Sequence, residues 1–249
     1  MRRLDLYLQH DRPLDAGELA QFKALIQRRR NREPVAYITG EKGFFNDTFK
    51  VAPGVLIPRP DTEVLVETAI GLLSPGNRAG KPPARVLELG AGSGAIIVSV
   101  AASCPGHDYF ACDISPDALA VARENARALC VCPIHFFQGN WMDAVGTTFD
   151  LILSNPPYIP TAHICGLEPE VKDHEPRLAL DGGVDGFSEF RKILDQAGTR
   201  LAPGGTLLFE MGFDQKEGMQ ALAGQCHWGG ELGFKQDLAG HNRLAIFKK

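Results

Sequence analysis

Val86-Leu87-Glu88-Leu89-Gly90-Ala91-Gly92-Ser93-Gly94-Ala95 is the stretch that decides the fold of this 249-residue chain. Its apolar beginning predicts a short buried strand, and the apolar run Ala95–Ala102 predicts a helix directly after it. Glycines at alternate positions between the two allow a tight turn and let backbone amides approach a ligand at the helix N-terminus. The stretch therefore predicts a strand–loop–helix unit of an α/β protein, with a ligand at the loop.

An acidic residue follows the glycine loop at a spacing that favours an adenosine-type cofactor. Asp113 ends the next expected strand, 19 residues after Gly94, where a carboxylate can bind ribose hydroxyls. Dinucleotides and S-adenosylmethionine both bind to such loops. Glu88 favours the second, because a carboxylate suits the ammonium of a methionine moiety better than it suits a pyrophosphate. The alternative is a glycine turn needed only for packing, with Asp113 as a cap of the following helix.

From Arg85 onward, apolar runs of strand length alternate with segments of helical periodicity. This alternation predicts a doubly wound α/β fold with a mostly parallel sheet. One helix has a clear start, because Ser115 can cap its N-terminus and Pro116 suits the first helical position. The other expected strands are 134–137, 151–153, 206–209 and 243–247, and the later helices 187–201 and 214–223, with a long loop at 159–186.

The front of the chain predicts a smaller module, and we expect a boundary between residues 1–54 and 55–249. Asp15 and Glu18 have the spacing of a capping box at a helix start, and Leu19, Phe22, Leu25 and Ile26 then share one face. Asn46-Asp47 is the expected two-residue turn of a β-hairpin. Four arginines between residues 28 and 32 fit either a solvated helix end or a patch that docks a partner.

Composition and charge exclude several classes of protein. The net charge is −4, which argues against a protein that coats nucleic acid. Residues 1–60 carry 11 Lys and Arg against 7 Asp and Glu, whereas the remainder carries 15 against 23. No apolar run approaches the ~20 residues that a membrane span needs, and no signal peptide opens the chain. The six cysteines lack metal-ligand spacing, so we expect buried free thiols, no metal site and a cytoplasmic location.

The most specific motif is Asn155-Pro156-Pro157-Tyr158, directly after the apolar run Leu151–Leu153. The carboxyl ends of strands are where open α/β folds bind ligands. A planar NH₂ group, as in a carboxamide or an adenine, is a poor nucleophile. The side-chain oxygen of Asn155 and the carbonyl of Pro156 could each accept one of its N–H bonds and aim its lone pair at a sulfonium methyl, while Tyr158 stacks on the planar group. The alternative is an ordinary surface turn.

These residues resemble class I S-adenosylmethionine-dependent methyltransferases, and more closely the HemK/PrmC type. That family methylates the glutamine side-chain amide (N5) of peptide chain release factors. The resemblance covers nearly the whole chain, since the strings 33–40, 55–63 and 175–183 are similar to the family's linker and post-turn signatures. It implies a Rossmann-like, doubly wound, mostly parallel seven-stranded sheet with a small helix-plus-hairpin module in front.

The resemblance also implies a role for each site residue. Gly90, Ala91, Gly92, Ser93 and Gly94 would hold the methionine part of S-adenosylmethionine, with Glu88 beside them. Asp113 would hold the ribose, and Trp141 would pack near the adenine. Asn155 would meet both cofactor and substrate, and Asn155, Pro156, Pro157 and Tyr158 would grip the glutamine of the release factor's Gly-Gly-Gln loop. Two features depart from the family: Asn140 replaces a common Asp, and only 54 residues precede Val55.

Several alternatives remain open. Glutamine methylation of a ribosomal protein requires the same chemistry, although the string Ile57–Glu63 favours the release-factor branch. An adenine-N6 DNA methyltransferase would need a basic face and a recognition region for the duplex. An NAD-dependent oxidoreductase would leave residues 155–158 without a role. A calcium loop at Asp181–Gly186 is rejected, because position 12 is Lys192 in place of the bidentate Glu. We expect no stable nucleic-acid partner and no membrane partner.

Overall fold

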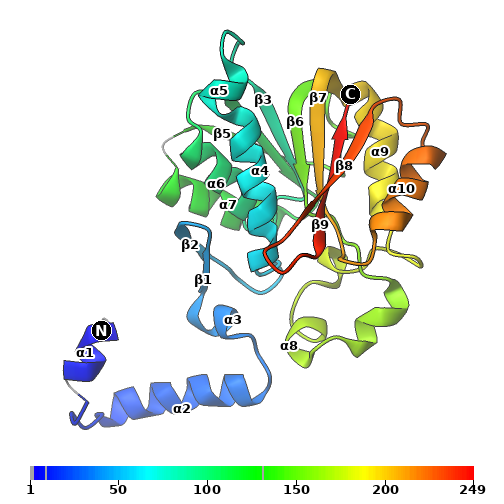
Figure 1. The fold of residues 1–249 in the computed structure, drawn as a ribbon. Helices are drawn as coiled ribbons and strands as arrows, with labels where there is room; N and C mark the ends of the chain where they lie inside the picture. Colours follow the sequence, from blue (N-terminus) through cyan, green and yellow to red (C-terminus); the bar gives the residue numbers. More distant parts are fainter. Residues whose placement is uncertain (1–2, 9, 131) are drawn as a thin grey trace.

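Seven strands form the central sheet in the computed structural model, which describes residues 3–8, 10–130 and 132–249. Their order is β5-β4-β3-β6-β7-β9-β8, and β9 alone runs opposite to the other six strands (Figure 1). This confirms the expected doubly wound, mostly parallel sheet. The strands are β3 (Arg85–Leu89), β4 (Asp108–Asp113), β5 (Ile134–Gln138), β6 (Phe149–Ser154), β7 (Leu201–Glu210), β8 (Glu231–Gln236) and β9 (Asn242–Lys248).

Helices cover both faces of the sheet, because successive strand residues point to opposite sides. Val86 packs into one apolar core with α4 (Glu63–Leu73), α6 (Ala95–Ser103) and α7 (Pro116–Leu129) nearby. Leu87 packs into the other core with α9 (Ser188–Arg200) and α10 (Lys216–Gln225). Ser115 caps α7 as expected, since its side chain accepts a hydrogen bond from the amide of Ala118. The short helix α5 (Pro75–Arg78) follows α4.

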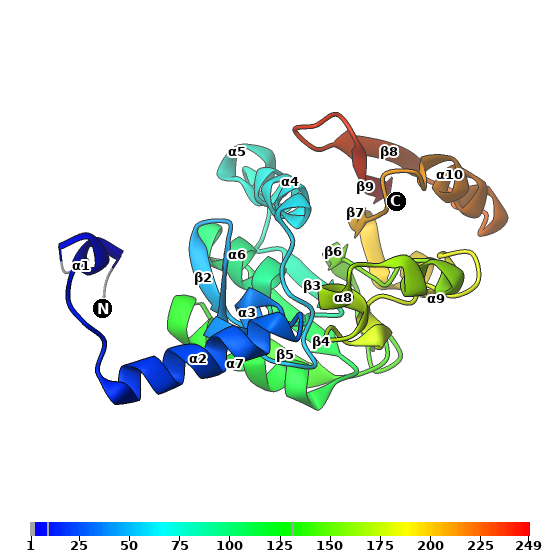
Figure 2. The same ribbon diagram turned by 90° about the horizontal axis from the view of Figure 1, so that it is seen from below.

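The front of the chain holds α1 (Arg3–Leu8), α2 (Ala16–Arg30), α3 (Val35–Thr39) and the hairpin β1 (Glu41–Phe44) and β2 (Asp47–Lys50). The predicted capping box is present at the start of α2. Figures 1 and 2 show α1 and α2 extending beyond the sheet. None of the residues of α2 is buried, so its predicted apolar face is exposed.

The arginines at the end of α2 have a third role that neither interpretation of the sequence included. Arg29 forms an ion pair of 2.8 Å with Glu170, and Arg32 lies 3.1 Å from the same carboxylate. Glu170 belongs to α8 (Pro169–Lys172), in the long loop after β6. Arg28 pairs locally with Glu33. Three of the four arginines are therefore paired with carboxylates, two of them with Glu170 in the loop after β6.

Three local expectations were wrong. The hairpin turns at Phe45-Asn46, because Phe44 pairs with Asp47, and Phe45 adopts a left-handed φ of 53°. The edge strand β8 was not predicted, and the expected loop 159–186 contains α8 and the 3₁₀ turns η2 (Thr161–Gly166) and η3 (Arg177–Ala179). All six cysteines are free as expected, but only Cys104 and Cys112 are buried, and Cys165 is exposed. A further 3₁₀ turn, η1 (Pro60–Thr62), leads directly into α4.

Candidate active site

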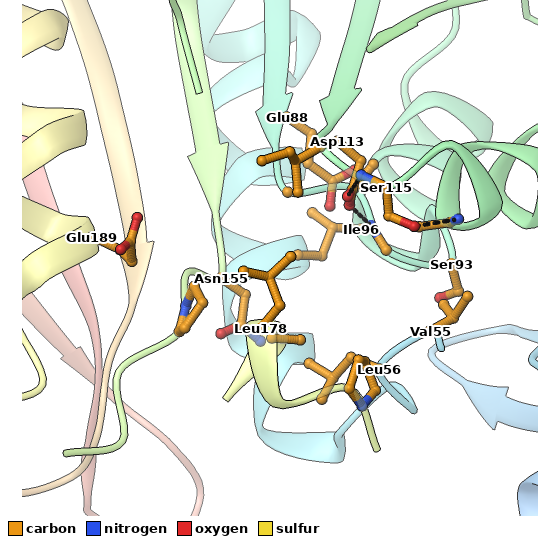
Figure 3. A pocket seen from close by; sticks show the side chains of 18 of the residues that line it. Val55, Leu56, Glu88, Ser93, Ile96, Asp113, Ser115, Asn155, Leu178 and Glu189 are labelled. Carbon is orange, nitrogen blue, oxygen red and sulfur yellow. Dashed lines mark hydrogen bonds between the residues drawn. The ribbon is translucent and has the colours of Figure 1, made fainter. Parts of the chain in front are cut away.

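A cavity of about 380 Å³ opens at the carboxyl ends of β3, β4 and β6, a volume within the range of about 300–1,000 Å³ for small-molecule sites. Parallel strands end at the same edge, so this topology brings the two predicted motifs together. Figure 3 shows Glu88, Asp113 and Asn155 around the cavity. Of the predicted site residues, the lining includes Glu88, Gly90, Ala91, Gly92, Ser93, Asp113, Trp141, Asn155 and Pro157.

The glycine loop needs its glycines for two different reasons. Gly90, Gly92 and Gly94 all adopt left-handed φ values, of 73°, 54° and 78°, which other L-residues rarely adopt. A Cβ at Gly94 would also lie only 3.1 Å from the Cβ of Ala122 on α7. Gly94 therefore allows close helix packing behind the cavity, whereas open space surrounds the Cβ position of Gly92.

Asp113 connects the end of β4 to the glycine loop. One carboxylate oxygen, Oδ2, accepts a hydrogen bond of 2.8 Å from the Gly92 amide. The other, Oδ1, accepts one of 2.9 Å from the Ser115 amide. Each oxygen retains a lone pair, so the carboxylate can still accept hydrogen bonds from a ligand's hydroxyl groups.

Glu88 is a buried carboxyl group on the cavity wall. Burial raises its pKa well above the ordinary value, and the negative charge of Asp113 adds to that rise. Its Oε2 accepts a hydrogen bond of 3.1 Å from the Ile97 amide, in the first turn of α6, where Gly94 provides no side-chain cap. None of the ion pairs among the described residues involves Glu88. A cationic ligand group would therefore stabilise its ionised form.

Trp141 is held over the glycine loop in an unusual backbone conformation. Its φ is 49°, and its indole ring lies 3.4 Å from where a Cβ on Gly90 would be. The indole N–H donates a hydrogen bond of 2.8 Å to Glu189, which itself pairs with Lys192. The neighbouring Asn140 also lines the cavity and donates its amide N–H to Asp143 at 3.3 Å. A flat aromatic wall therefore faces the glycine loop.

The Asn-Pro-Pro-Tyr turn contributes two of its four residues to the cavity. Asn155 and Pro157 line it, and the Nδ2 of Asn155 lies 3.4 Å from the hydroxyl oxygen of Thr62, to which it donates. Pro156 is buried and Tyr158 is half-buried against the second core, and neither lines the cavity. Burial raises the pKa of the Tyr158 phenol, and the negative charge of Glu210 adds to this rise.

The loop after the turn supports it through backbone contacts. Ile159 directly follows the turn, and its amide donates a hydrogen bond to the carbonyl oxygen of Leu180 in the loop. The amide of Gly182, also in the loop, donates a hydrogen bond to the carbonyl oxygen of Ile159. A Cβ at Gly182 would lie 2.8 Å from the Pro157 carbonyl oxygen, and one at Gly186 would lie 2.5 Å from that of Tyr158. The glycines of the string 181–186 therefore allow close packing on the turn. No cluster of metal-ligating side chains occurs among the described residues.

A buried carboxylate joins this loop to the segment that precedes α4. Glu175 accepts a hydrogen bond of 3.0 Å from the Ile57 amide and forms an ion pair with Arg59. Pro58 and Arg59 line the cavity on one side, and Pro176 and Leu178 line it on another. Figure 3 shows Leu178 and Asn155 among the side chains that line the cavity. Glu175 therefore fixes two cavity walls that are far apart in the sequence.

Several functional candidates escaped the analysis of the sequence. Thr62 and Leu178 lie inside the strings 55–63 and 175–183, which are similar to the family's signatures. The resemblance therefore pointed to these segments but implied no role for either residue. Glu189 had no such signal, because only the packing of α9 beside Trp141 brings it to the cavity. The same holds for Glu210, which ends β7 beside the Asn155 turn.

Comparisons with known proteins agree with this geometry. A family model described as the methyltransferase small domain matches residues 73–164, and one described as the PrmC N-terminal domain matches residues 1–40. None of the described helices is long and apolar enough to span a membrane. A methyltransferase from Pyrococcus furiosus shares the fold, with a TM-score of 0.60 at 18% identity over 92% of this chain and 98% of that one.

Two sequence relatives cover most of the chain. The release factor glutamine methyltransferase of Geobacter sulfurreducens is 43% identical over 228 residues, which are 90% of this chain and 78% of the relative. That of Caulobacter vibrioides is 40% identical over 246 residues, which are 98% of this chain and 83% of the relative. The chain belongs to the family of release factor glutamine methyltransferases.

Proposed function

We propose that this enzyme transfers the methyl group of S-adenosylmethionine to the side-chain amide nitrogen, N5, of the glutamine in the Gly-Gly-Gln loop of a peptide chain release factor. The observation that carries the proposal is the convergence of Asn155 with Glu88 and Asp113 on one cavity. Asn155 supplies a hydrogen-bond acceptor for a carboxamide, and Glu88 and Asp113 supply acceptors for an adenosine-type cofactor. Relatives named release factor glutamine methyltransferase identify the substrate class.

The residues present fit the cofactor. Glu88 is a buried carboxylate without an ion-pair partner among the described residues, and so suits an ammonium group. The loop Gly90–Gly94 leaves open space at Gly92 for close approach of a ligand. Asp113 would hold the ribose, while Trp141 packs against the adenine and the Oδ1 of Asn140 accepts from its amino group. When bound, S-adenosylmethionine supplies an electrophilic methyl carbon, whose bond to sulfur breaks as its bond to the amide nitrogen forms.

The enzyme's own contribution is mainly positioning. The Oδ1 of Asn155 would accept one N–H bond of the glutamine amide and the carbonyl oxygen of Pro156 the other, which would fix the direction of the nitrogen lone pair. Tyr158, which packs on the second core outside the cavity lining, would lie beside that amide once the substrate is bound. Alignment of two reactants in this way can contribute about 7–11 kcal/mol to catalysis, and the acceptor oxygens stabilise the positive charge that develops on nitrogen. The methylated nitrogen then releases one proton to water, so no strong general base is required.

The release factor would also contact the N-terminal module, which we assign to residues 1–54. Its helix α2 exposes Leu19, Phe22, Leu25 and Ile26 on one face, and exposed apolar groups of this kind are typical of protein–protein contacts. The ion pairs from Arg29 and Arg32 to Glu170 hold the end of α2 near the loop that supports the Asn155 turn. A substrate bound to α2 would therefore be held near the cavity.

A labelled methyl-transfer assay tests the proposal. Purified release factor and its Gly-Gly-Ala variant are incubated with the enzyme and radiolabelled S-adenosylmethionine, with duplex DNA and ribosomal protein in parallel. We expect label only on the release factor that retains the glutamine of its Gly-Gly-Gln loop. Asn155→Ala should abolish transfer and leave thermal unfolding nearly unchanged, whereas Asn77→Ala, an exposed control outside the cavity lining, should keep full transfer activity. Label on both release factors, or full activity of Asn155→Ala, would overturn the proposal.

A further inference from the structure

Glu210 is a buried carboxyl group beside the catalytic turn that the mechanism above does not use. It ends β7, whose Phe209 pairs with Ser154 on β6. Glu210 is the next residue on β7 and Asn155 is the first residue after β6, so the two lie close together at the cavity edge of the sheet, where the Asn155 side chain acts on the pKa of Glu210. Glu210 is 2% exposed and does not line the cavity itself. It therefore stands behind Asn155, outside contact with the proposed ligands.

The surroundings of Glu210 leave it without a charge partner of its own. Arg243 is the nearby cation, and it already pairs with Asp61 at 2.8 Å and with Asp237 at 3.1 Å. The Oε2 of Glu210 is buried and forms no hydrogen bond with any of the described residues. A buried carboxyl oxygen without a partner is costly, and such an atom in a folded protein calls for an explanation such as a role in the site.

Burial raises the pKa of Glu210 to about 7, and the charge of Asp61 contributes to that rise. Thr62, Arg243 and Asn155 act in the opposite direction, because a hydroxyl, a cation and an amide N–H all favour the ionised form. Tyr158 also faces this carboxyl group. The pKa values of Asp237 and of the Tyr158 phenol are shifted away from neutrality, downward and upward respectively. Among the carboxyl and phenol groups named here, Glu210 is therefore the one whose pKa lies near 7; His241 contacts Asp237 at 3.8 Å, at the edge of this cluster.

We propose that Glu210 is a positioning residue that sets which way the Asn155 carboxamide faces. The two ends of a carboxamide are nearly equal in shape, and only the orientation with Oδ1 toward the cavity can accept the substrate's N–H. Thr62 cannot select this orientation alone, because a hydroxyl both donates and accepts. An ionised carboxylate only accepts, so it holds the Thr62 hydroxyl and the Asn155 Nδ2 as donors pointing away from the cavity. This inference rests on the role of Asn155 in the proposed function.

Protonation should reverse this selection. A neutral carboxyl group carries an O–H that can donate to Thr62 or to the Oδ1 of Asn155, which permits the flipped amide. The flipped amide presents N–H groups to the N–H groups of the glutamine, and the two repel. We therefore expect kcat to rise with pH through a midpoint near 7, the value to which burial raises the pKa of Glu210.

Kinetics of three variants test the role of Glu210. Glu210→Leu should lower kcat roughly 100-fold, the loss that a misplacement of about 1 Å can cause, with little change in the KM for S-adenosylmethionine. Glu210→Gln cannot ionise and, like the protonated acid, carries a donor that permits the flipped amide, so kcat should fall to the level that the wild type shows well below pH 7 and should lose the rise near pH 7. Thr206→Val, a buried control on the same strand, should keep both rate and pH profile.

A spectroscopic measurement tests the same inference without any substrate. The side-chain ¹⁵N–H₂ signals of Asn155 should shift with pH, with a midpoint near 7, and should stop shifting in Glu210→Gln, while those of Asn77 stay constant in both. If the wild-type enzyme fails to methylate release factor, the proposed function falls and this titration still decides the role of Glu210. Wild-type kinetics with an unchanged pH profile in Glu210→Gln, or an Asn155 signal insensitive to pH, would overturn the inference.

Discussion

Replacing Glu210 with glutamine should make the protein more stable at pH 8 and leave its stability nearly unchanged at pH 5. Glu210 is buried, and burial raises its pKa from 4.5 to about 7. Because the folded state holds this proton more tightly than the unfolded state, the stabilising contribution is complete below pH 4.5 and is lost as the pH rises through 7. Glutamine resembles the protonated form and cannot ionise. At pH 8 the variant therefore avoids the cost of a buried charge.

The size of this effect follows from the shift in pKa. A rise from 4.5 to about 7, at 1.36 kcal/mol for each pH unit, corresponds to about 3 kcal/mol of unfolding free energy. Glu88 also has a raised pKa, but it is present in both proteins and cancels in the difference between them. The comparison between variant and wild type therefore isolates Glu210.

Urea unfolding at pH 5 and pH 8, followed by circular dichroism, measures the difference. We expect the free energy of unfolding of the variant to exceed that of the wild type by about 3 kcal/mol at pH 8 and by much less at pH 5. A difference that is equal at the two pH values, or a wild type that is the more stable protein at pH 8, would refute the reasoning. The same variant should lose activity, so stability and catalysis would change in opposite directions.

Three further changes have definite expected outcomes. Asp113→Ala should weaken binding of S-adenosylmethionine roughly 30-fold, the equivalent of about 2 kcal/mol for a charged hydrogen bond; calorimetry that finds an unchanged Kd contradicts its role. Gly182→Ala should push its Cβ against the Pro157 carbonyl and lower kcat roughly 100-fold, whereas Gly166→Ala, with open space around it, should keep full activity. Glu175→Ala should lower the free energy of unfolding by about 1.5–3 kcal/mol, whereas removal of the exposed Glu231 should have almost no effect in the same urea titration.

The sequence predicted the parts of the fold in which burial and periodicity coincide. Leu151–Leu153 is a continuous apolar run and Val86–Leu89 is interrupted only by Glu88, and both strands lie at the centre of the sheet. The edge strand β8 escaped prediction because its residues are only half-buried and alternate weakly. The hairpin turn was misplaced by one residue, since Phe45 adopts a left-handed φ that bulky side chains rarely adopt.

The residues of the site also fall into those that local sequence predicts and those that it does not. Gly90–Gly94 and Asn155–Tyr158 are contiguous motifs, so each could be recognised from local sequence. Glu175 and Glu189 act across 116 and 48 residues of chain, on Arg59 and Trp141. Such pairings depend on how loops and helices pack after folding, and no local pattern encodes them. The arginines that end α2 illustrate the same limit, because their partner Glu170 lies in a helix that the sequence did not predict.

The position of Trp141 gives the protein a built-in optical reporter. The chain has two tryptophans: the indole of Trp141 lies on the cavity wall over Gly90, whereas Trp228 packs on Phe247 with a ring-centre distance of 5.3 Å and does not line the cavity. An adenine ring stacked on the indole of Trp141 would quench the fluorescence of that residue. The fluorescence of Trp228 would stay constant and serve as an internal reference. Replacement of Trp228 by phenylalanine would leave one emitter, whose intensity follows cofactor binding in real time without any added label.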